Sequence, residues 1–200
     1  MDADQPHVRV ILDKRSSSLT AAFASVPLPP DVVPARGSDA QRVVWQPATA
    51  TGVPLLGGLI TLDDLRRGEI DHALAIGVTR ARSYVWSWPA QRTDGATDNP
   101  TAIPEGARFR LDPELDIDSL DLPPLTRMIA EAAQRYGVVV RDKTGSSVTF
   151  EAEDATRFPT DPYYGTGGWF GGRSPSALLA RFPWSRLQAL RLDVRSRTSP

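Results

Sequence analysis

The residues best suited to acid–base chemistry are one histidine and several carboxylates that lie far apart in the sequence. His72 is one of two histidines in the chain, and it directly follows Asp71. Adjacent residues of a strand point to opposite faces, so we do not expect these two side chains to form an acid–base pair. His72 would need a distant carboxylate, for which Glu105 and Asp142 are the candidates. The alternative is a half-buried structural histidine.

If the protein has a site, we expect it at one edge of a sheet, with the loop after Trp88 as its wall. His72 with Glu105 or Asp142 would supply the acid and the base. Arg92 offers a planar fork of donors for an anion, and Trp169 would act as a lid. The predicted catalytic residues are His72, Glu105 and Asp142, and the predicted substrate-binding residues are Arg92, Asp94, Tyr164 and Trp169.

Aromatic residues suggest a second kind of contact. Four of them lie in a glycine-rich loop, namely Tyr163, Tyr164, Trp169 and Phe170, and three alternate along a strand, namely Tyr84, Trp86 and Trp88. Such rings make flat platforms for sugars and for protein partners. The alternative for the strand residues is packing in the core, and for the loop residues it is packing or docking like a lid.

Several classes of chemistry are excluded or disfavoured by what the sequence lacks. The chain has no cysteine, which excludes disulfides, thiolate zinc sites and a cysteine nucleophile. The acidic run 112–121 lacks the glycine and the terminal glutamate of an EF-hand, and no phosphate-binding glycine loop is present. A net charge of -1 argues against binding to a nucleic-acid backbone. We therefore predict no metal, no cofactor, no nucleic-acid partner and no membrane span.

The elements that must position these residues can be read from caps, turns and alternation. We predict one main helix at 123–136, after two prolines, and short helices at 61–67 and 175–181, each with a capping residue. Alternating or apolar runs predict strands at 7–12, 70–78, 84–88 and 107–111, and a hairpin over 138–151. In this arrangement His72 shares a strand face with Leu74 and Ile76.

The 200 residues, 40% of them hydrophobic and 24% charged, are typical of one globular domain. We predict a β-rich α+β fold, in which an antiparallel sheet or sandwich is packed by the helix at 123–136. Residues 1–50 are expected to be an irregular, proline-rich segment, 51–193 the globular domain, and 194–200 a polar tail.

About half of the chain resembles a family of largely uncharacterised bacterial proteins that is frequent in actinobacteria and often exported. The resemblance rests on PLLGGLI at 54–60, GEIDHAL at 68–74, PEGARFRL at 104–111 and AQRYGVVVRD at 133–142. It implies a secreted or surface setting, although the chain carries no recognisable signal peptide. It implies no activity and transfers no catalytic residue.

These observations favour a surface-associated or secreted domain that binds carbohydrate or another cell-envelope polymer. In the enzymatic version of this hypothesis, the protein is a metal-independent hydrolase or lyase that acts on a glycan. The alternative is a non-enzymatic structural or protein-interaction domain, in which the same aromatic residues are core or interface. The sequence leaves the ligand and the oligomeric state open.

Overall fold

A computed structural model describes residues 49–145, 147–155 and 159–197, together with the backbone of 8–14. The described residues form two sheets. In the large sheet, of order β1-β7-β2-β6-β5-β8, the strands are β1 (Val8–Lys14), β7 (Val148–Glu153), β2 (Leu74–Val78), β6 (Val138–Lys143), β5 (Arg108–Leu111) and β8 (Leu187–Ala189). In the small sheet, of order β4-β3-β9, they are β4 (Ile103–Glu105), β3 (Ala81–Ser87) and β9 (Val194–Ser196).

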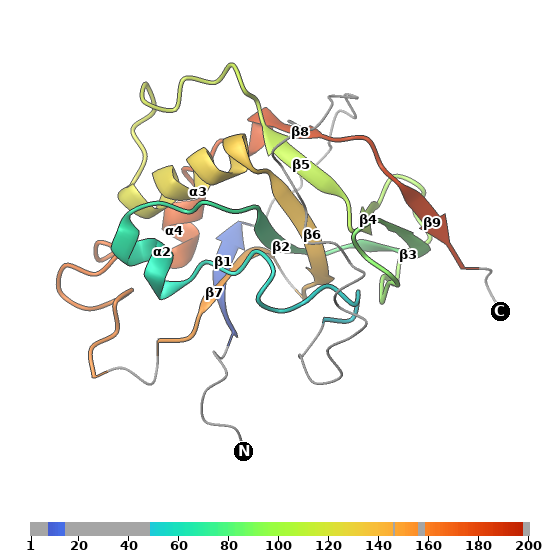
Figure 1. Cartoon of the computed structure of the whole chain (residues 1–200), viewed down its shortest axis with the longest axis horizontal. Helices are drawn as coiled ribbons and strands as arrows, with labels where there is room; N and C mark the ends of the chain where they lie inside the picture. Colours follow the sequence, from blue (N-terminus) through green and yellow to red (C-terminus); the bar gives the residue numbers. More distant parts are fainter. Residues whose placement is uncertain (1–7, 15–48, 146, 156–158, 198–200) are drawn as a thin grey trace.

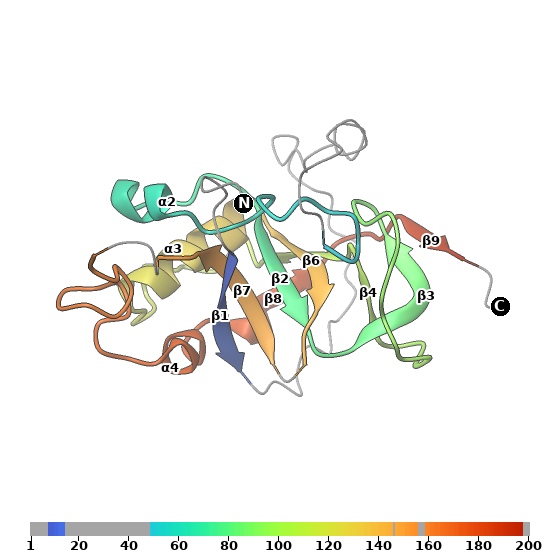
Figure 2. The same ribbon diagram turned by 90° about the horizontal axis from the view of Figure 1, so that it is seen from below.

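The helices of the described chain lie at one end of the large sheet, and the small sheet lies at the other (Figure 1, Figure 2). They are α2 (Leu62–Arg67), α3 (Pro124–Arg135) and α4 (Pro175–Leu179), with a 3-10 turn at Trp184–Arg186. None of these helices is long and apolar enough to cross a membrane. The predicted α+β, strand-rich class is confirmed, and the three predicted helices are present.

Local chemistry explains why α2 forms where it does. Thr61 caps its first turn, and Asp64 completes the reciprocal pair of bonds known as a capping box. Acids occupy the first turn and arginines the last, which suits the helix dipole. Gly68 ends the helix with φ +72°. A helix of only six residues is thus held by its caps and by the burial of Leu62 and Leu65.

The core forms around β2, whose five residues are all buried because the strand lies between β7 and β6. The pairing of β2 with β6 is parallel, so the large sheet is mixed rather than wholly antiparallel. The predicted hairpin over 138–151 is also wrong, because its two strands, β6 and β7, do not pair with each other: β2 lies between them. The apolar side of α3 packs on this sheet through Leu125, Met128 and Ile129.

Two of the predicted strands have different limits. β2 begins at Leu74, so His72 lies in a bend before the strand and does not share a strand face with Leu74 and Ile76. β3 ends at Ser87, and Tyr84 has a positive φ of 57°, which interrupts the alternation expected for Tyr84, Trp86 and Trp88.

Both sheets include a strand from outside residues 51–193, the range expected for the globular domain. β1 pairs with β7 from within residues 1–50, and β9 pairs with β3 from within the predicted tail. The rest of the proline-rich segment lies outside the described residues, apart from Thr49 and Ala50.

The junction between the two sheets leaves no room for a side chain at Gly106. Its φ is +80°, its amide donates to the carbonyl of Val140 at 2.7 Å, and a Cβ atom there would lie 1.6 Å from the carbonyl oxygen of Ser87. We expect Gly106→Ala to lower the free energy of unfolding by about 3 kcal/mol or more, because it adds overpacking to the cost of a left-handed conformation. Urea denaturation measures this loss.

Gly68→Ala is the matched control, since Gly68 has a similar φ but a Cβ atom added there would meet no other atom within 4 Å. Only the conformational cost remains, about 1 kcal/mol. Equal losses in the two variants would show that the junction is not tightly packed at Gly106.

Candidate functional site

A pocket of about 500 Å³ lies between the segment from Gly52 to Leu59 and the large sheet. Its walls are mainly apolar, and its polar groups gather where α2 leads into β2. The apolar and glycine lining comprises Gly52, Val53, Pro54, Leu56, Gly57, Gly58, Leu59, Ala73, Leu74, Ala75, Pro89 and Val139, and the polar lining comprises Thr61, Asp64, Arg67, Asp71, His72, Gln91 and Arg141. This size is typical of small-molecule sites.

β6 supplies both core and pocket residues because side chains alternate along a strand. Val138 and Val140 are buried in the core, whereas Val139 and Arg141 line the pocket. The pairing with β2 shifts at this point, from Ile76 opposite Val140 to Gly77 opposite Asp142, so Arg141 is the extra residue of a β-bulge. A bulge of this kind can redirect a side chain, and here the residue concerned is Arg141, which faces the pocket segment.

Arg141 holds the pocket segment in place. Its fully buried guanidinium donates to the carbonyl oxygens of Pro54 at 3.2 Å and Gly57 at 2.9 Å, and also to that of Leu55. Its own carbonyl oxygen accepts a hydrogen bond from the Thr51 hydroxyl at 2.7 Å. The segment has little regular structure, and these bonds help to hold the pocket wall in place, together with the backbone bond from Ala75 to the carbonyl oxygen of Gly58 at 3.0 Å.

The charge of Arg141 is balanced inside the protein. The guanidinium forms an ion pair with Glu151 on β7, whose side chain is 8% exposed. Burial lowers the pKa of Arg141 to about 10, so the group is still protonated at neutral pH. Because its contacts go to protein oxygens, we assign Arg141 a structural role in the pocket wall.

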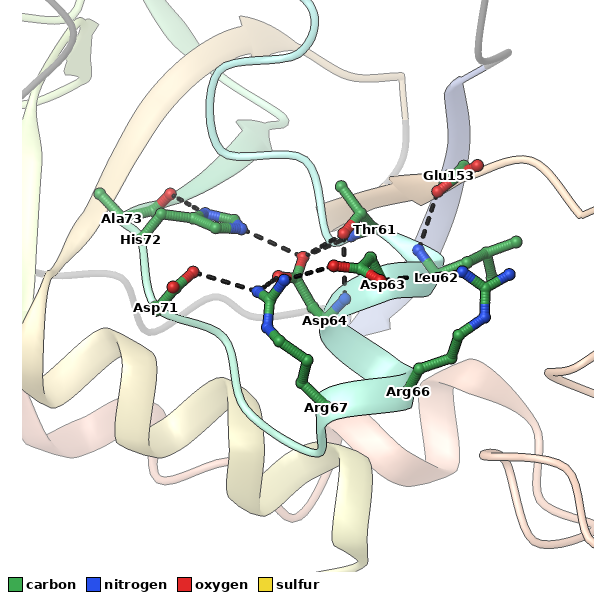
Figure 3. Close-up of polar contacts among 10 residues, drawn as sticks. All are labelled: Thr61, Leu62, Asp63, Asp64, Arg66, Arg67, Asp71, His72, Ala73 and Glu153. Atoms are coloured by element: carbon green, nitrogen blue, oxygen red, sulfur yellow. Dashed lines mark hydrogen bonds and ion pairs between the residues drawn. The ribbon is translucent and has the colours of Figure 1, made fainter.

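The polar end of the pocket is built around the carboxylate of Asp64, which is 2% exposed (Figure 3). One oxygen accepts from the backbone amide and the hydroxyl of Thr61, both at 2.7 Å, and lies 3.2 Å from Nε2 of His72. The other accepts from Arg67 at 2.6 Å. Burial alone would raise the pKa of Asp64, but the hydrogen bonds from Thr61 and His72 outweigh burial and lower it below 3.8.

Both ring nitrogens of His72 face protein oxygens (Figure 3). Nδ1 lies 3.0 Å from the carbonyl oxygen of Ala73, and Nε2 faces the carboxylate of Asp64. Since both oxygens are acceptors, both contacts are hydrogen bonds at once only when the ring carries two protons. His72 thus joins α2 to the chain that enters β2, with both ring nitrogens directed at protein oxygens.

The predicted partners of His72 meet one another instead. Carboxylate oxygens of Asp94, Glu105 and Asp142 lie within 4.8 Å of one another, and none of the three residues lines the pocket. The three carboxylates thus lie together, as the sequence hypothesis expected, but His72 is not with them: its observed partner is Asp64. Asp71, next to His72, pairs with Arg67.

The other predicted binding residues lie away from the pocket. Arg92 donates to the carbonyl oxygen of Ala50 at 2.7 Å and so fastens the start of the pocket segment. Trp169 packs against the core, and Tyr164 is exposed with its ring edge-on to Phe170, 4.7 Å between centroids. Their proposed role in ligand binding stays a prediction.

Sequence reasoning missed Asp64, Arg67 and Arg141 as residues of a site. The capping-box pattern marks Asp64, but only as a helix cap. Nothing local to Arg141 indicates its burial, because its partners are Glu151, ten residues away, and carbonyl groups more than eighty residues away.

Comparison with protein-family models found no match, and the comparisons with curated proteins and with solved structures found none either. The resemblance to an exported bacterial family, and the secreted setting it implies, therefore stay predictions.

Asp64 should make stability depend on pH. A carboxylate whose pKa is lowered by folding stabilises the protein above its unfolded value, and this contribution is lost as the pH falls through the folded value. We expect Asp64→Asn to cost about 2 kcal/mol at pH 7, through the lost cap and ion pairs, and progressively less below pH 3.8. Urea denaturation between pH 2 and pH 7 tests this.

The control is Asp63→Asn, on the same helical turn, whose side chain is 63% exposed. It should change the pH profile little, because exposed ion pairs contribute little. An Asp64→Asn deficit that stays constant down to pH 2 would contradict the assigned role.

Removing one partner of the buried ion pair should be costly. We expect Arg141→Met or Glu151→Leu alone to destabilise the protein by about 3–5 kcal/mol, because each leaves the other charge buried without its partner. The double variant should recover much of the loss in a thermal melt, yet leave the pocket segment more accessible to hydrogen exchange, since the carbonyl groups of Leu55 and Gly57 lose the arginine donor. Additive losses in the double variant would contradict this.

Proposed function

We propose that the protein is a carbohydrate-binding domain, and that the pocket between residues 52–59 and the large sheet takes a sugar unit of a neutral glycan. The observation that carries the proposal is the pairing of an apolar wall with a polar end in one pocket of about 500 Å³. A sugar ring has the same division, with C–H faces and hydroxyl edges.

The apolar wall suits the body of a compact ring. Pro54, Leu56 and Val139 contribute rigid or branched side chains, and Leu56 is 49% exposed at this position. A large apolar side chain left half in water gains free energy when a ligand covers it. Gly57 and Gly58 add backbone surface without side chains, which lets a ring approach closely.

The polar end suits hydroxyl groups better than a charged group. Of the pocket residues at this end, Asp64 and Asp71 are both paired with Arg67, so no large excess of one charge faces a ligand. Strong preference for an anion or a cation needs an excess of one sign. A hydroxyl both donates and accepts, and it can meet the exposed carboxylate of Asp71 and the partly exposed guanidinium of Arg67.

The same geometry favours binding over cleavage at this pocket. A general base needs a lone pair within reach of the ligand. The nitrogens of His72 and the oxygens of Asp64 are directed at protein partners. We therefore assign these groups to holding the polar end in shape.

Leu56→Ala tests the assignment of the pocket. A glycan array of neutral and cell-envelope oligosaccharides identifies a binder, and calorimetry with the methyl glycoside of its terminal unit measures affinity. We expect Leu56→Ala to weaken binding about fivefold, because roughly 1 kcal/mol of apolar contact is lost. Val194→Ala, which truncates another exposed hydrophobic residue that lies on β9, should leave affinity unchanged.

The test also separates the alternatives. Binding that is lost in Trp169→Ala but kept in Leu56→Ala would place the site on the aromatic loop and contradict the pocket. No saturable binding, together with self-association that grows with concentration, would favour the protein-interaction domain instead.

A further inference from the structure

Three carboxylates from three segments meet outside the pocket. Asp94 lies in the loop after β3, Glu105 ends β4, and Asp142 lies in β6 next to the bulge. An oxygen of each lies within 4.8 Å of the others. Like charges at this separation repel one another, so the fold brings them together against their electrostatic preference.

Glu105 is the observation that distinguishes this cluster from an ordinary acidic surface. Its side chain is completely buried, with 0% exposure. Oε2 accepts from the backbone amide of Asp94 at 3.1 Å, but Oε1 has no hydrogen-bond partner among the described residues. A buried carboxylate oxygen without a partner is costly, so such an atom inside a carboxylate cluster indicates a missing ligand.

We propose that Asp94, Glu105 and Asp142 form a binding site for Ca²⁺. Calcium takes oxygen ligands at roughly 2.3–2.6 Å, so ligands on opposite sides of the ion lie about 5 Å apart, and the three carboxylates can share one ion. The partly exposed Asp94 gives solvent access and leaves positions for water. The absence of nitrogen and sulfur ligands in the cluster suits a hard cation.

The charges around the cluster call for a cation. Lys143 donates to the carbonyl oxygen of Asp94 at 3.0 Å and lies 3.8 Å from its carboxylate, so three carboxylates face one ammonium group. Arg141 also attracts Asp142, but its guanidinium is paired with Glu151. When all three carboxylates are ionised, a divalent ion would neutralise the two remaining negative charges.

Protons compete with the ion. Burial raises the pKa of Glu105 to about 7. The Thr93 hydroxyl opposes this rise, and the Asp94 carboxylate adds to it. Burial and Asp94 also raise the pKa of Asp142. Metal binding needs the ionised carboxylates and therefore releases protons. The affinity for Ca²⁺ should therefore be higher at pH 8 than at pH 6.

The ion would join the two sheets, since β4 belongs to the small sheet and β6 to the large one. Calorimetry and thermal melts of the chelator-treated full chain with CaCl₂ test the proposal. We expect one saturable site with a Kd in or below the millimolar range and a rise in Tm. Glu105→Gln should fold and abolish both effects, because it keeps the shape but removes the charge.

Two further variants keep the test decisive. Asp94→Asn changes a partly exposed residue and should weaken Ca²⁺ binding at least tenfold even if Glu105→Gln fails to fold. Glu114→Gln, in the exposed acidic run, should have no effect. The proposal is overturned if Ca²⁺ does not bind saturably, if Asp94→Asn binds it as wild type does, or if Mg²⁺ binds more tightly than Ca²⁺.

Discussion

The buried ion pair between Arg141 and Glu151 lies behind the pocket segment and helps to hold it in place. Taking two charges out of water is costly unless they are paired and their remaining donors are satisfied. Here the guanidinium also donates hydrogen bonds to the carbonyl groups of Pro54, Leu55 and Gly57. The charge and the segment therefore support each other: the segment accepts hydrogen bonds from Nη1 of the arginine, and these bonds help to hold a glycine- and proline-rich stretch in place.

The bulge in β6 lets consecutive residues serve different regions of the molecule. Arg141 holds the pocket segment, and Asp142 joins the carboxylates near the small sheet. The following residue, Lys143, binds the loop that carries Asp94. The end of this strand thus connects the pocket wall with the junction of the two sheets, so a change at either place is expected to act on the other through one short stretch of backbone.

Signals that are local in the sequence predicted the fold well, whereas signals that depend on distant partners did not. Thr61, Gly68 and Ser174 mark helix ends because caps act over three or four residues. The error over β6 and β7 arose because a strand sixty residues earlier lies between them. Alternation placed His72 in β2, but its contact with Asp64 belongs to a bend that periodicity does not reveal.

The sequence predicted that Asp94, Glu105 and Asp142 converge, but at one edge of a single sheet, whereas they meet where β4 of the small sheet lies near β6 of the large one. Their chemistry was not predictable, because it depends on burial. In an exposed loop Glu105 would be an ordinary carboxylate that needs no partner, whereas behind β3 it lies in a place where water cannot hydrate it. The histidine that would have made the cluster an acid–base pair is committed to Asp64. What remains is a set of oxygen atoms alone, and such a set is suited to holding a proton or a hard cation rather than to relaying a proton through an imidazole.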